Sequence, residues 1–150
     1  MTVPLFTAEQ EVSTSDDYYT PAWVFEDMGI GFDLDVAAPP GGVPWIPAKR
    51  YYTKADDGLS QPWAGRVWMN PPYSGVTPWW ERFKDHNNGI ALLPWVKSAW
   101  VVDMWQSHAT LVLPPKWFNF KGQGSISYGI VFVGFGEWTL EPLRRIGHVR

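Results

Sequence analysis

The stretch that decides the fold reads Arg66-Val67-Trp68-Met69-Asn70-Pro71-Pro72-Tyr73, and Thr77-Pro78 follows it closely. Residues 66–69 predict a short buried strand, because apolar side chains dominate them. Thr77 and Pro78 predict the start of a helix, with Thr as the N-cap and Pro at the first helical position. The tetrapeptide Asn70 to Tyr73 is therefore expected at the carboxyl end of a strand, where open α/β sheets bind their ligands.

Further strands and helices are expected on both sides of this stretch. Before it, Thr20-Pro21 predicts a helix start and Gly29 its end, and residues 30–36 alternate as a strand. Residues 37–65 are rich in Pro and Gly and predict a long mobile loop with one abbreviated strand at Tyr51-Tyr52-Thr53. After it, strands are predicted over residues 89–94, 110–113 and 126–135, with a helix from Ser98 to about Gln106. This order predicts an α/β fold with a shortened, mostly parallel sheet.

Length and composition limit the classes of function that this chain can have. The 150 residues suit one domain over residues 18–150, preceded by a flexible polar arm over residues 1–17. The chain has no cysteine, which excludes a disulfide framework, a thiolate zinc site and a cysteine nucleophile. We also expect no leader segment and no membrane span, since no apolar stretch has the required length. Its three histidines share no metal-ligand spacing, so no metal site is expected.

The residue types of Asn70 to Tyr73 suit methyl transfer to a flat exocyclic amine such as adenine N6. The lone pair of such an amine is delocalised into its ring until both of its hydrogens are held by acceptors. The Asn70 side-chain oxygen offers one acceptor and the Pro71 carbonyl another, while Tyr73 can stack on a base turned out of its helix. The same tetrapeptide also suits a simple strand-ending turn.

Beyond this loop, the chain resembles the phage-type DNA N6-adenine methyltransferases, the phage Dam-like family. The matching segments are Tyr19-Thr20-Pro21, Phe32-Asp33-Leu34-Asp35-Val36-Ala37-Ala38, Asp56-Asp57-Gly58-Leu59-Ser60-Gln61-Pro62-Trp63 and Val67-Trp68-Met69-Asn70-Pro71-Pro72-Tyr73. The resemblance implies a reduced Rossmann-like fold and an S-adenosylmethionine-dependent enzyme that methylates adenine in DNA. It also implies that Asn70, Pro71, Pro72 and Tyr73 form the catalytic loop.

The resemblance further implies contacts to the cofactor. They fall on Tyr19, Thr20, Pro21, Asp35, Ala37 and Asp57. Asp33 and Asp35 share a face of their strand, and Asp35 at its carboxyl end is the better candidate. Several of these residues also suit structural roles: Thr20 and Pro21 as a helix start, Asp35 and Asp57 as turn residues. The segment 35–42 only approximates the glycine-rich turn of larger methyltransferases.

Residues that would contact DNA are harder to identify from the sequence. The candidates are Trp45, Lys49, Arg50, Lys116 and Lys121, with Arg144, Arg145 and Arg150 as further basic positions. The formal net charge of −3 argues against a broadly basic nucleic-acid surface, although a local basic face is compatible with it. Trp45 lies in Pro-rich loop sequence, and Lys116 and Lys121 lie in the aromatic loop 114–124.

The sequence thus predicts an adenine-specific DNA methyltransferase acting on double-stranded DNA, with a homodimer as a possible assembly. By resemblance, it would be a phage or prophage protein working in the cytoplasm of a bacterial host. Alternatives stay open. The same loop chemistry serves cytosine N4, an RNA guanine amine or a protein glutamine. Outside enzymology, the alternative is a non-catalytic DNA-binding module or an aromatic ligand-binding module.

Overall fold

A seven-stranded sheet forms the centre of the described part of the chain, in the order β2-β1-β3-β4-β6-β5-β7. The computed structural model describes residues 19–115 and 129–150. The strands are β1 (Phe32–Asp35), β2 (Ala48–Tyr51), β3 (Val67–Met69), β4 (Gly89–Trp95), β5 (Thr110–Leu113), β6 (Gly129–Phe135) and β7 (His148–Val149). The α-helices are α2 (Ala22–Met28), α3 (Val76–His86), α4 (Ala99–Gln106) and α5 (Leu140–Arg144). Short 3-10 helices are η2 (Lys54–Asp56), η3 (Gly58–Ser60) and η4 (Glu137–Thr139).

The strand pairing is parallel in one half of the sheet and antiparallel in the other. β2, β1, β3 and β4 pair in parallel, whereas β4, β6, β5 and β7 pair antiparallel. From β1 the chain runs to β2 on one side and then returns to β3 on the other. This reversal is a topological switch point, and such a point leaves a crevice outside the carboxyl ends of the strands.

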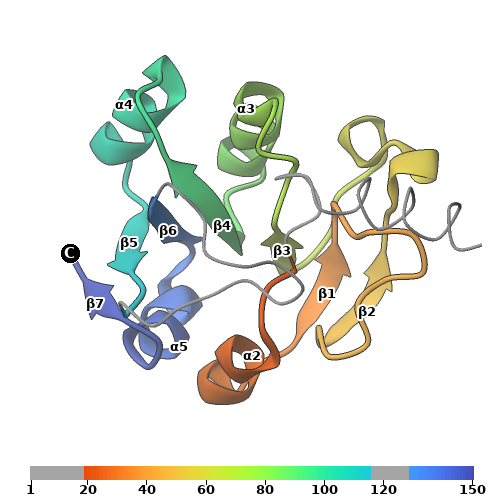
Figure 1. The fold of residues 1–150 in the computed structure, drawn as a ribbon, viewed down its shortest axis with the longest axis horizontal. Helices are drawn as coiled ribbons and strands as arrows, with labels where there is room; N and C mark the ends of the chain where they lie inside the picture. The colour runs from red at the N-terminus through yellow and green to blue at the C-terminus, as the bar shows by residue number, and fades with distance from the viewer. Residues whose placement is uncertain (1–18, 116–128) are drawn as a thin grey trace, which may run out of the picture.

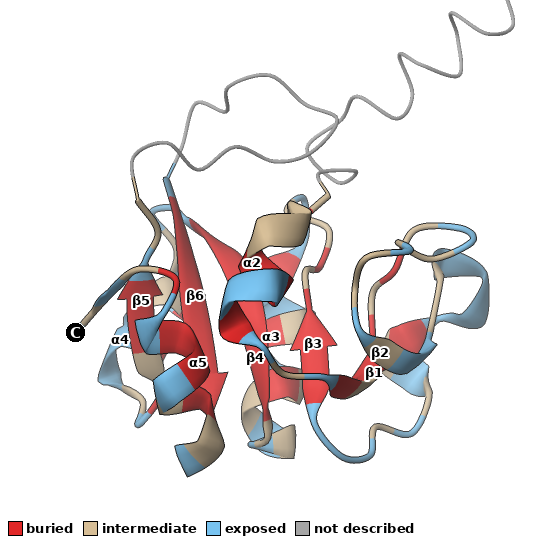
Figure 2. Cartoon of the chain, turned by 90° about the horizontal axis from the view of Figure 1, so that it is seen from below, coloured by how far each residue is buried: buried red, intermediate tan, exposed pale blue. Residues whose placement is uncertain are grey.

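Helices cover both faces of the sheet. Figure 1 shows α3 and α4 on one side and α2 and α5 on the other. Side chains of successive strand residues point to opposite faces, so each central strand contributes side chains to two hydrophobic clusters. Trp68 of β3 belongs to the cluster under α2 and α5, whereas its neighbours Val67 and Met69 belong to the cluster under α3 and α4. Figure 2 shows the central strands buried and the outer sides of α2 and α5 exposed.

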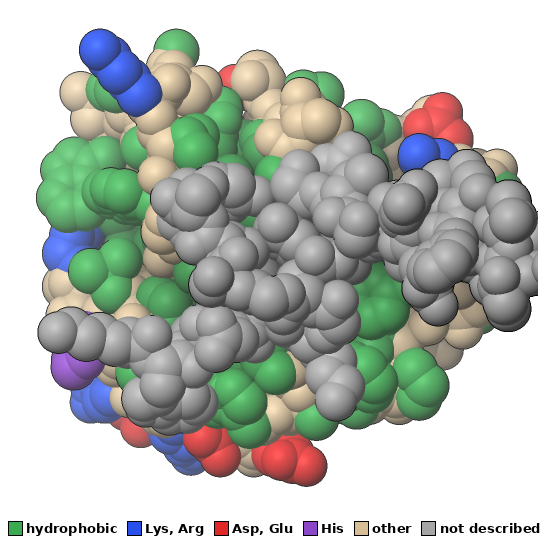
Figure 3. Space-filling view, viewed as in Figure 1, with side chains coloured by type: hydrophobic (Ala, Val, Ile, Leu, Met, Phe, Trp, Pro, Cys, Tyr) green, Lys and Arg blue, Asp and Glu red, His purple; other side chains and the backbone are tan. Residues whose placement is uncertain are grey.

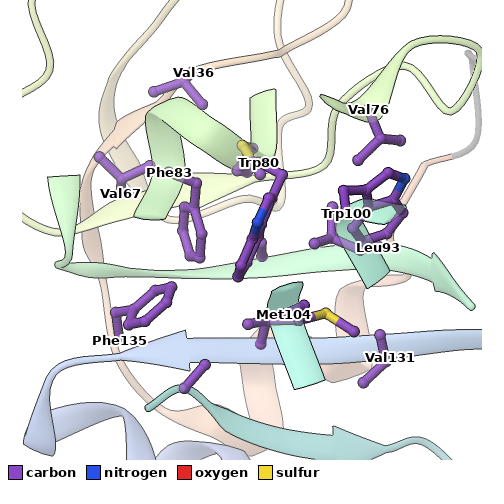
Figure 4. Close-up of a cluster of buried hydrophobic side chains, with 14 of the residues drawn as sticks. Val36, Val67, Val76, Trp80, Phe83, Leu93, Trp100, Met104, Val131 and Phe135 are labelled. Carbon is purple, nitrogen blue, oxygen red and sulfur yellow. The ribbon is translucent and has the colours of Figure 1, made fainter. Parts of the chain in front are cut away.

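Aromatic side chains fill the cluster under α3 and α4, as Figure 4 shows. Trp80 and Phe83 of α3 are fully buried, and both rings contact Phe135 of β6, with centroids 5.9 Å and 5.5 Å away. The buried indole N–H of Trp80 donates to the Asp103 carboxylate of α4 at 2.7 Å, so it is satisfied. Trp68, Trp80 and Trp100 are thus buried in the core, whereas Trp95 and Trp105 are exposed.

The predicted elements around the catalytic loop are confirmed. Strands β1, β3, β4 and β5 and helix α4 occupy the expected ranges to within a few residues. Gly29 ends α2 in the left-handed conformation, with φ of 67°. β6 is confirmed from Gly129 onward, and residues 126–128 of its predicted range lie outside the described residues.

Several details of the prediction are wrong. The N-cap of α3 is Gly75 rather than Thr77, and α2 begins at Ala22 after an extended Pro21. Pro78 is tolerated as the third helical residue because N–H groups of the first turn lack helical partners. Residues 37–65 contain β2, η2 and η3 rather than one long loop, and the strand is Ala48–Tyr51 instead of residues 51–53.

The end of the chain adds structure that was not predicted. α5 and the edge strand β7 follow β6, and Leu143 of α5 is fully buried against the sheet. The sheet is therefore shortened in the length of its strands rather than in their number, and it is mixed rather than mostly parallel. The α/β class and one continuous sheet agree with the prediction.

Candidate functional site

A pocket of about 510 Å³ opens at the switch point between β1 and β3. Seven of the residues predicted for catalysis or cofactor binding line it: Tyr19, Thr20, Asp35, Ala37, Asp57, Asn70 and Pro72. They come from the segment before α2, the ends of β1 and β3, and the turn between η2 and η3. Segments far apart in the sequence thus meet at one site. A volume of this size lies within the range of about 300–1,000 Å³ that is typical of small-molecule sites.

Asn70 follows the last residue of β3 and lines the pocket. Its side-chain nitrogen donates to the Thr20 hydroxyl at 3.4 Å. Thr20 is 1% exposed, so this contact lies in the floor of the site. The contact joins the segment before α2 to the loop after β3, although the two residues lie 50 positions apart in the sequence.

The rest of the tetrapeptide is anchored to the sheet. Pro71 is buried and does not line the pocket, whereas Pro72 does. The Tyr73 hydroxyl donates to the Leu92 carbonyl of β4 at 3.1 Å, and its ring packs against both hydrophobic clusters. Tyr73 is absent from the pocket lining, so its stacking role stays a prediction. The observed contacts give it an anchoring role.

Asp35 lies at the carboxyl end of β1 and is 3% exposed. Burial raises the pKa of its carboxyl to about 7, and a backbone hydrogen bond opposes this effect. That bond is donated by the Ala37 N–H to Oδ1 at 3.2 Å. The turn role that the sequence allowed for Asp35 is therefore present, together with its place in the pocket.

Asp33 does not reach the pocket. It accepts the Arg66 backbone N–H at 2.7 Å and pairs with Lys49 at 3.4 Å. The Arg66 hydrogen bond and the Lys49 ammonium lower the pKa of Asp33. This carboxylate holds the beginning of β3 beside β1, which is a structural role.

The 3-10 helices between β2 and β3 form one rim of the pocket. Asp57 lies there in the left-handed conformation, with φ of 57°, and its carboxylate accepts the Ser60 hydroxyl at 2.8 Å. Gly58 packs against β1 so closely that a Cβ atom would lie 2.2 Å from the Val36 carbonyl oxygen. Its own carbonyl accepts the Trp63 indole N–H at 2.8 Å. These contacts fix the rim against the end of β1.

Trp68 is a pocket residue that the sequence prediction missed. It is fully buried on β3 and lines the pocket. Its Nε1–H is buried without a hydrogen-bond partner among the described residues. The signal was present in the sequence: Trp68 precedes Asn70 by two residues, and strand residues two apart share a face. Lys54 and Trp79 also line the pocket, and neither was predicted there.

Other predicted residues lie elsewhere. Trp45 does not line the pocket, and its indole N–H instead donates to the Thr20 carbonyl at 2.7 Å. Pro21 precedes α2 without lining the pocket. Lys49 and Arg50 are exposed on the edge strand β2, outside the pocket lining. Lys116 and Lys121 lie outside the described residues.

The basic residues near the carboxyl end serve structure. The Arg145 guanidinium donates to the Met28 carbonyl at 2.9 Å, and that of Arg150 donates to the Trp105 and Ala109 carbonyls at 3.1 Å each. Arg144 pairs with Glu141 at 3.2 Å. On the face shown in Figure 3, the visible Lys and Arg side chains stand apart around the edge, with Asp and Glu among them. Where the described residues are visible on this face, they therefore form no continuous basic surface.

The described ranges also bear on a metal site and on a membrane-spanning helix. Within residues 19–115 and 129–150, no group of three or more His, Cys, Asp or Glu side chains could hold a metal ion. In the same ranges, no helix combines the length and apolarity that crossing a bilayer requires.

Comparison with known proteins supports the resemblance. A family model described as DNA N-6-adenine-methyltransferase (Dam) matches residues 7–113. The DNA N-6-adenine-methyltransferase of Haemophilus phage HP1 (strain HP1c1) is 38% identical to the chain over 71 residues. That alignment covers 44% of this chain and 39% of the relative, so the chain matches less than half of the relative's length. No solved structure matches the chain significantly. Because the family model spans well over half of the sequence, the chain belongs to the DNA N-6-adenine-methyltransferase (Dam) family.

Proposed function

We propose that the protein transfers a methyl group from S-adenosylmethionine to the N6 amine of adenine in double-stranded DNA. One observation carries the proposal. Asn70 of the Asn-Pro-Pro-Tyr loop and the buried Asp35 line the same pocket, at the carboxyl ends of neighbouring strands. The first residue type suits the acceptor amine, and the second suits a cationic methyl donor.

The pocket residues fit S-adenosylmethionine as the donor. When bound, this molecule supplies an electrophilic methyl group on a sulfonium. The Asp35 carboxyl is buried and can accept hydrogen bonds from an ammonium or from ribose hydroxyls. Val36, Ile46 and Trp79 offer apolar surface for an adenine ring. The unpartnered indole N–H of Trp68 is a further buried donor in the lining that a polar ligand would satisfy.

The catalytic loop acts on the target amine. The Asn70 side-chain oxygen accepts one N6 hydrogen. Pro71 does not line the pocket, so its carbonyl must turn toward the bound base to accept the other. Together these bonds take the nitrogen lone pair out of conjugation with the ring. Both acceptors are neutral, so they stabilise the cationic amine that forms on transfer without deprotonating it beforehand. The cationic amine loses one N6 proton after the transfer. The rate enhancement comes from positioning and from electrostatic stabilisation.

Access to the amine requires the adenine to leave the duplex. A base inside a helix cannot present N6 to a pocket, so we propose that the target adenine is flipped toward Asn70. The exposed Lys49 and Arg50 on β2 remain candidates for phosphate contacts, and so do Lys116 and Lys121. A homodimer would enlarge the DNA-contacting surface. By analogy with the phage relative, the reaction would take place in the cytoplasm of a bacterial host.

The test measures tritiated methyl incorporation into duplex DNA, RNA and protein. We expect incorporation into adenine-containing DNA, and we expect Asn70→Ala to reduce it by about 100-fold to 1,000-fold while the fold persists. Asn87→Gly is the matched control, because Asn87 is exposed at the end of α3 with φ of 58°, which glycine adopts freely. Methyl incorporation only into RNA, only into protein or only into cytosine would show that this molecule, and not adenine in DNA, is the substrate. Equal activity of the Asn70→Ala variant and the wild type would refute the catalytic assignment.

A further inference from the structure

The side chain of Trp68 is held rigidly in the floor of the pocket. Its ring contacts Phe25 of α2, with centroids 4.8 Å apart and planes at 75°, and Phe32 of β1 at 5.7 Å. Trp68 is fully buried, yet its Nε1–H has no hydrogen-bond partner within the described ranges. A buried donor without a partner is destabilising, so one that a structure retains calls for an explanation such as a bound ligand, ion or water.

A buried acceptor lies on the neighbouring strand. Asp35 of β1 is the register partner of Trp68 on β3, so the two side chains share one face of the sheet. Both residues line the pocket. Among the described residues, the Asp35 carboxyl accepts one hydrogen bond, from the Ala37 N–H to Oδ1, so Oδ2 keeps its acceptor capacity for a ligand. Trp68 therefore brings a buried donor, and Asp35 an acceptor, to the floor of the pocket, on strands about 4.8 Å apart.

An α-amino acid zwitterion matches this arrangement. Its carboxylate accepts hydrogen bonds, its ammonium donates them, and one carbon atom separates the two groups. We propose that Trp68 and Asp35 together bind the amino-acid end of the methyl donor, with the Trp68 Nε1–H donating to the carboxylate and the Asp35 carboxylate accepting from the ammonium. This inference rests on the proposed function and adds Trp68 as a specificity-determining residue for the donor.

The test compares two nucleosides by isothermal titration calorimetry. S-adenosylhomocysteine carries the amino-acid end, whereas 5′-methylthioadenosine has the same nucleoside without it. Trp68→Phe keeps a buried ring and removes the N–H. We expect this variant to bind S-adenosylhomocysteine about 10-fold or more weakly, as for a lost hydrogen bond to a charged group, and to bind 5′-methylthioadenosine within about twofold of wild type. Asp35→Asn should likewise weaken the binding of S-adenosylhomocysteine more than the binding of 5′-methylthioadenosine.

Trp138→Phe is the matched control. The Trp138 indole N–H donates to Asn88 at 2.7 Å, outside the pocket lining, so this variant should bind both nucleosides like wild type. Unchanged S-adenosylhomocysteine binding by Trp68→Phe would overturn the inference, and so would equal weakening of both nucleosides. Wild-type protein that binds neither nucleoside would overturn it as well.

A second measurement avoids any dependence on the fold of the variants. In the wild-type protein, titration with S-adenosylhomocysteine should move the Trp68 indole ¹H–¹⁵N resonance downfield, while 5′-methylthioadenosine should not. An indole resonance that responds equally to both nucleosides would contradict the inference. Selective S-adenosylhomocysteine binding without methyl transfer to DNA would refute the proposed function and leave this inference standing.

Discussion

The buried carboxyl of Asp35 makes a measurable prediction about folding and pH. Its pKa in the folded protein is about 7, compared with an ordinary value of 3.8. Because the folded state holds this proton more tightly than the unfolded state, the stability that Asp35 contributes is fully present below pH 3.8 and is lost as pH rises through 7. The full loss above pH 7 corresponds to about 4 kcal/mol, at about 1.4 kcal/mol per pKa unit. Between pH 5 and pH 8 the expected loss is about 2.5 kcal/mol.

The variant Asp35→Asn removes this titration and keeps a side chain of similar size. Urea denaturation of both proteins at pH 5 and pH 8 gives the difference in unfolding free energy at each pH. We expect that difference to shift by about 2.5 kcal/mol in favour of the variant at pH 8. All other titratable groups are common to both proteins, so their effect cancels.

Asp33→Asn is the matched control for this experiment. The pKa of Asp33 is lowered by its backbone hydrogen bond and by Lys49, so this carboxyl is ionised at both pH values. Its stabilising contribution is lost only as pH falls below the ordinary range, and Asp33→Asn should show no comparable shift between pH 5 and pH 8. The same pH dependence in wild type and Asp35→Asn would refute the assignment of a raised pKa to Asp35.

Three further predictions concern the residues around the pocket. Gly58→Ala places a Cβ atom 2.2 Å from the Val36 carbonyl oxygen, so we expect a loss of about 1–3 kcal/mol in urea denaturation, together with weaker binding of S-adenosylhomocysteine. Gly129→Ala should be tolerated, because its nearest neighbour lies at 3.7 Å; equal effects of the two variants would count against the close contact at Gly58. Tyr73→Phe keeps the ring and removes the hydrogen bond to Leu92, so unfolding should require about 1 kcal/mol less while most methyl transfer persists; a large loss of activity with unchanged stability would instead assign the hydroxyl to catalysis. Phe83→Ala empties a fully buried site in the core and should cost about 3–5 kcal/mol by the same denaturation assay, and a cost below about 1 kcal/mol would contradict its burial.

Local sequence patterns predicted the strands near the catalytic loop because each of them combines an apolar run with a clear boundary. β3, for example, is followed by a proline pair that ends it. β2 was misplaced because its residues Ala48-Lys49-Arg50-Tyr51 are largely exposed at the edge of the sheet. An edge strand has no buried face to impose alternation, and its pairing with β1 depends on tertiary contacts.

In the site, too, local sequence patterns predicted some residues, whereas others depended on tertiary contacts. Asn70 and Asp35, predicted for catalysis and for cofactor binding, both line the pocket, since both lie at the carboxyl ends of parallel strands; their roles stay predictions. Trp45 and Trp68 show what the sequence did not resolve. The loop position of Trp45 suggested a site and its strand position assigned Trp68 to the core, yet Trp45 donates to the Thr20 backbone and Trp68 lines the pocket. Which side of a buried ring faces a cavity depends on how β1, β3 and α2 pack together.

The most direct test of the account is nucleoside mass spectrometry of plasmid DNA from a bacterial host that lacks its own adenine methylation. Expression of the wild-type protein should produce N6-methyladenine, and expression of Asn70→Ala to the same level should not. N6-methyladenine at equal amounts from both proteins would contradict the role of Asn70, and its absence from both would contradict the proposed function.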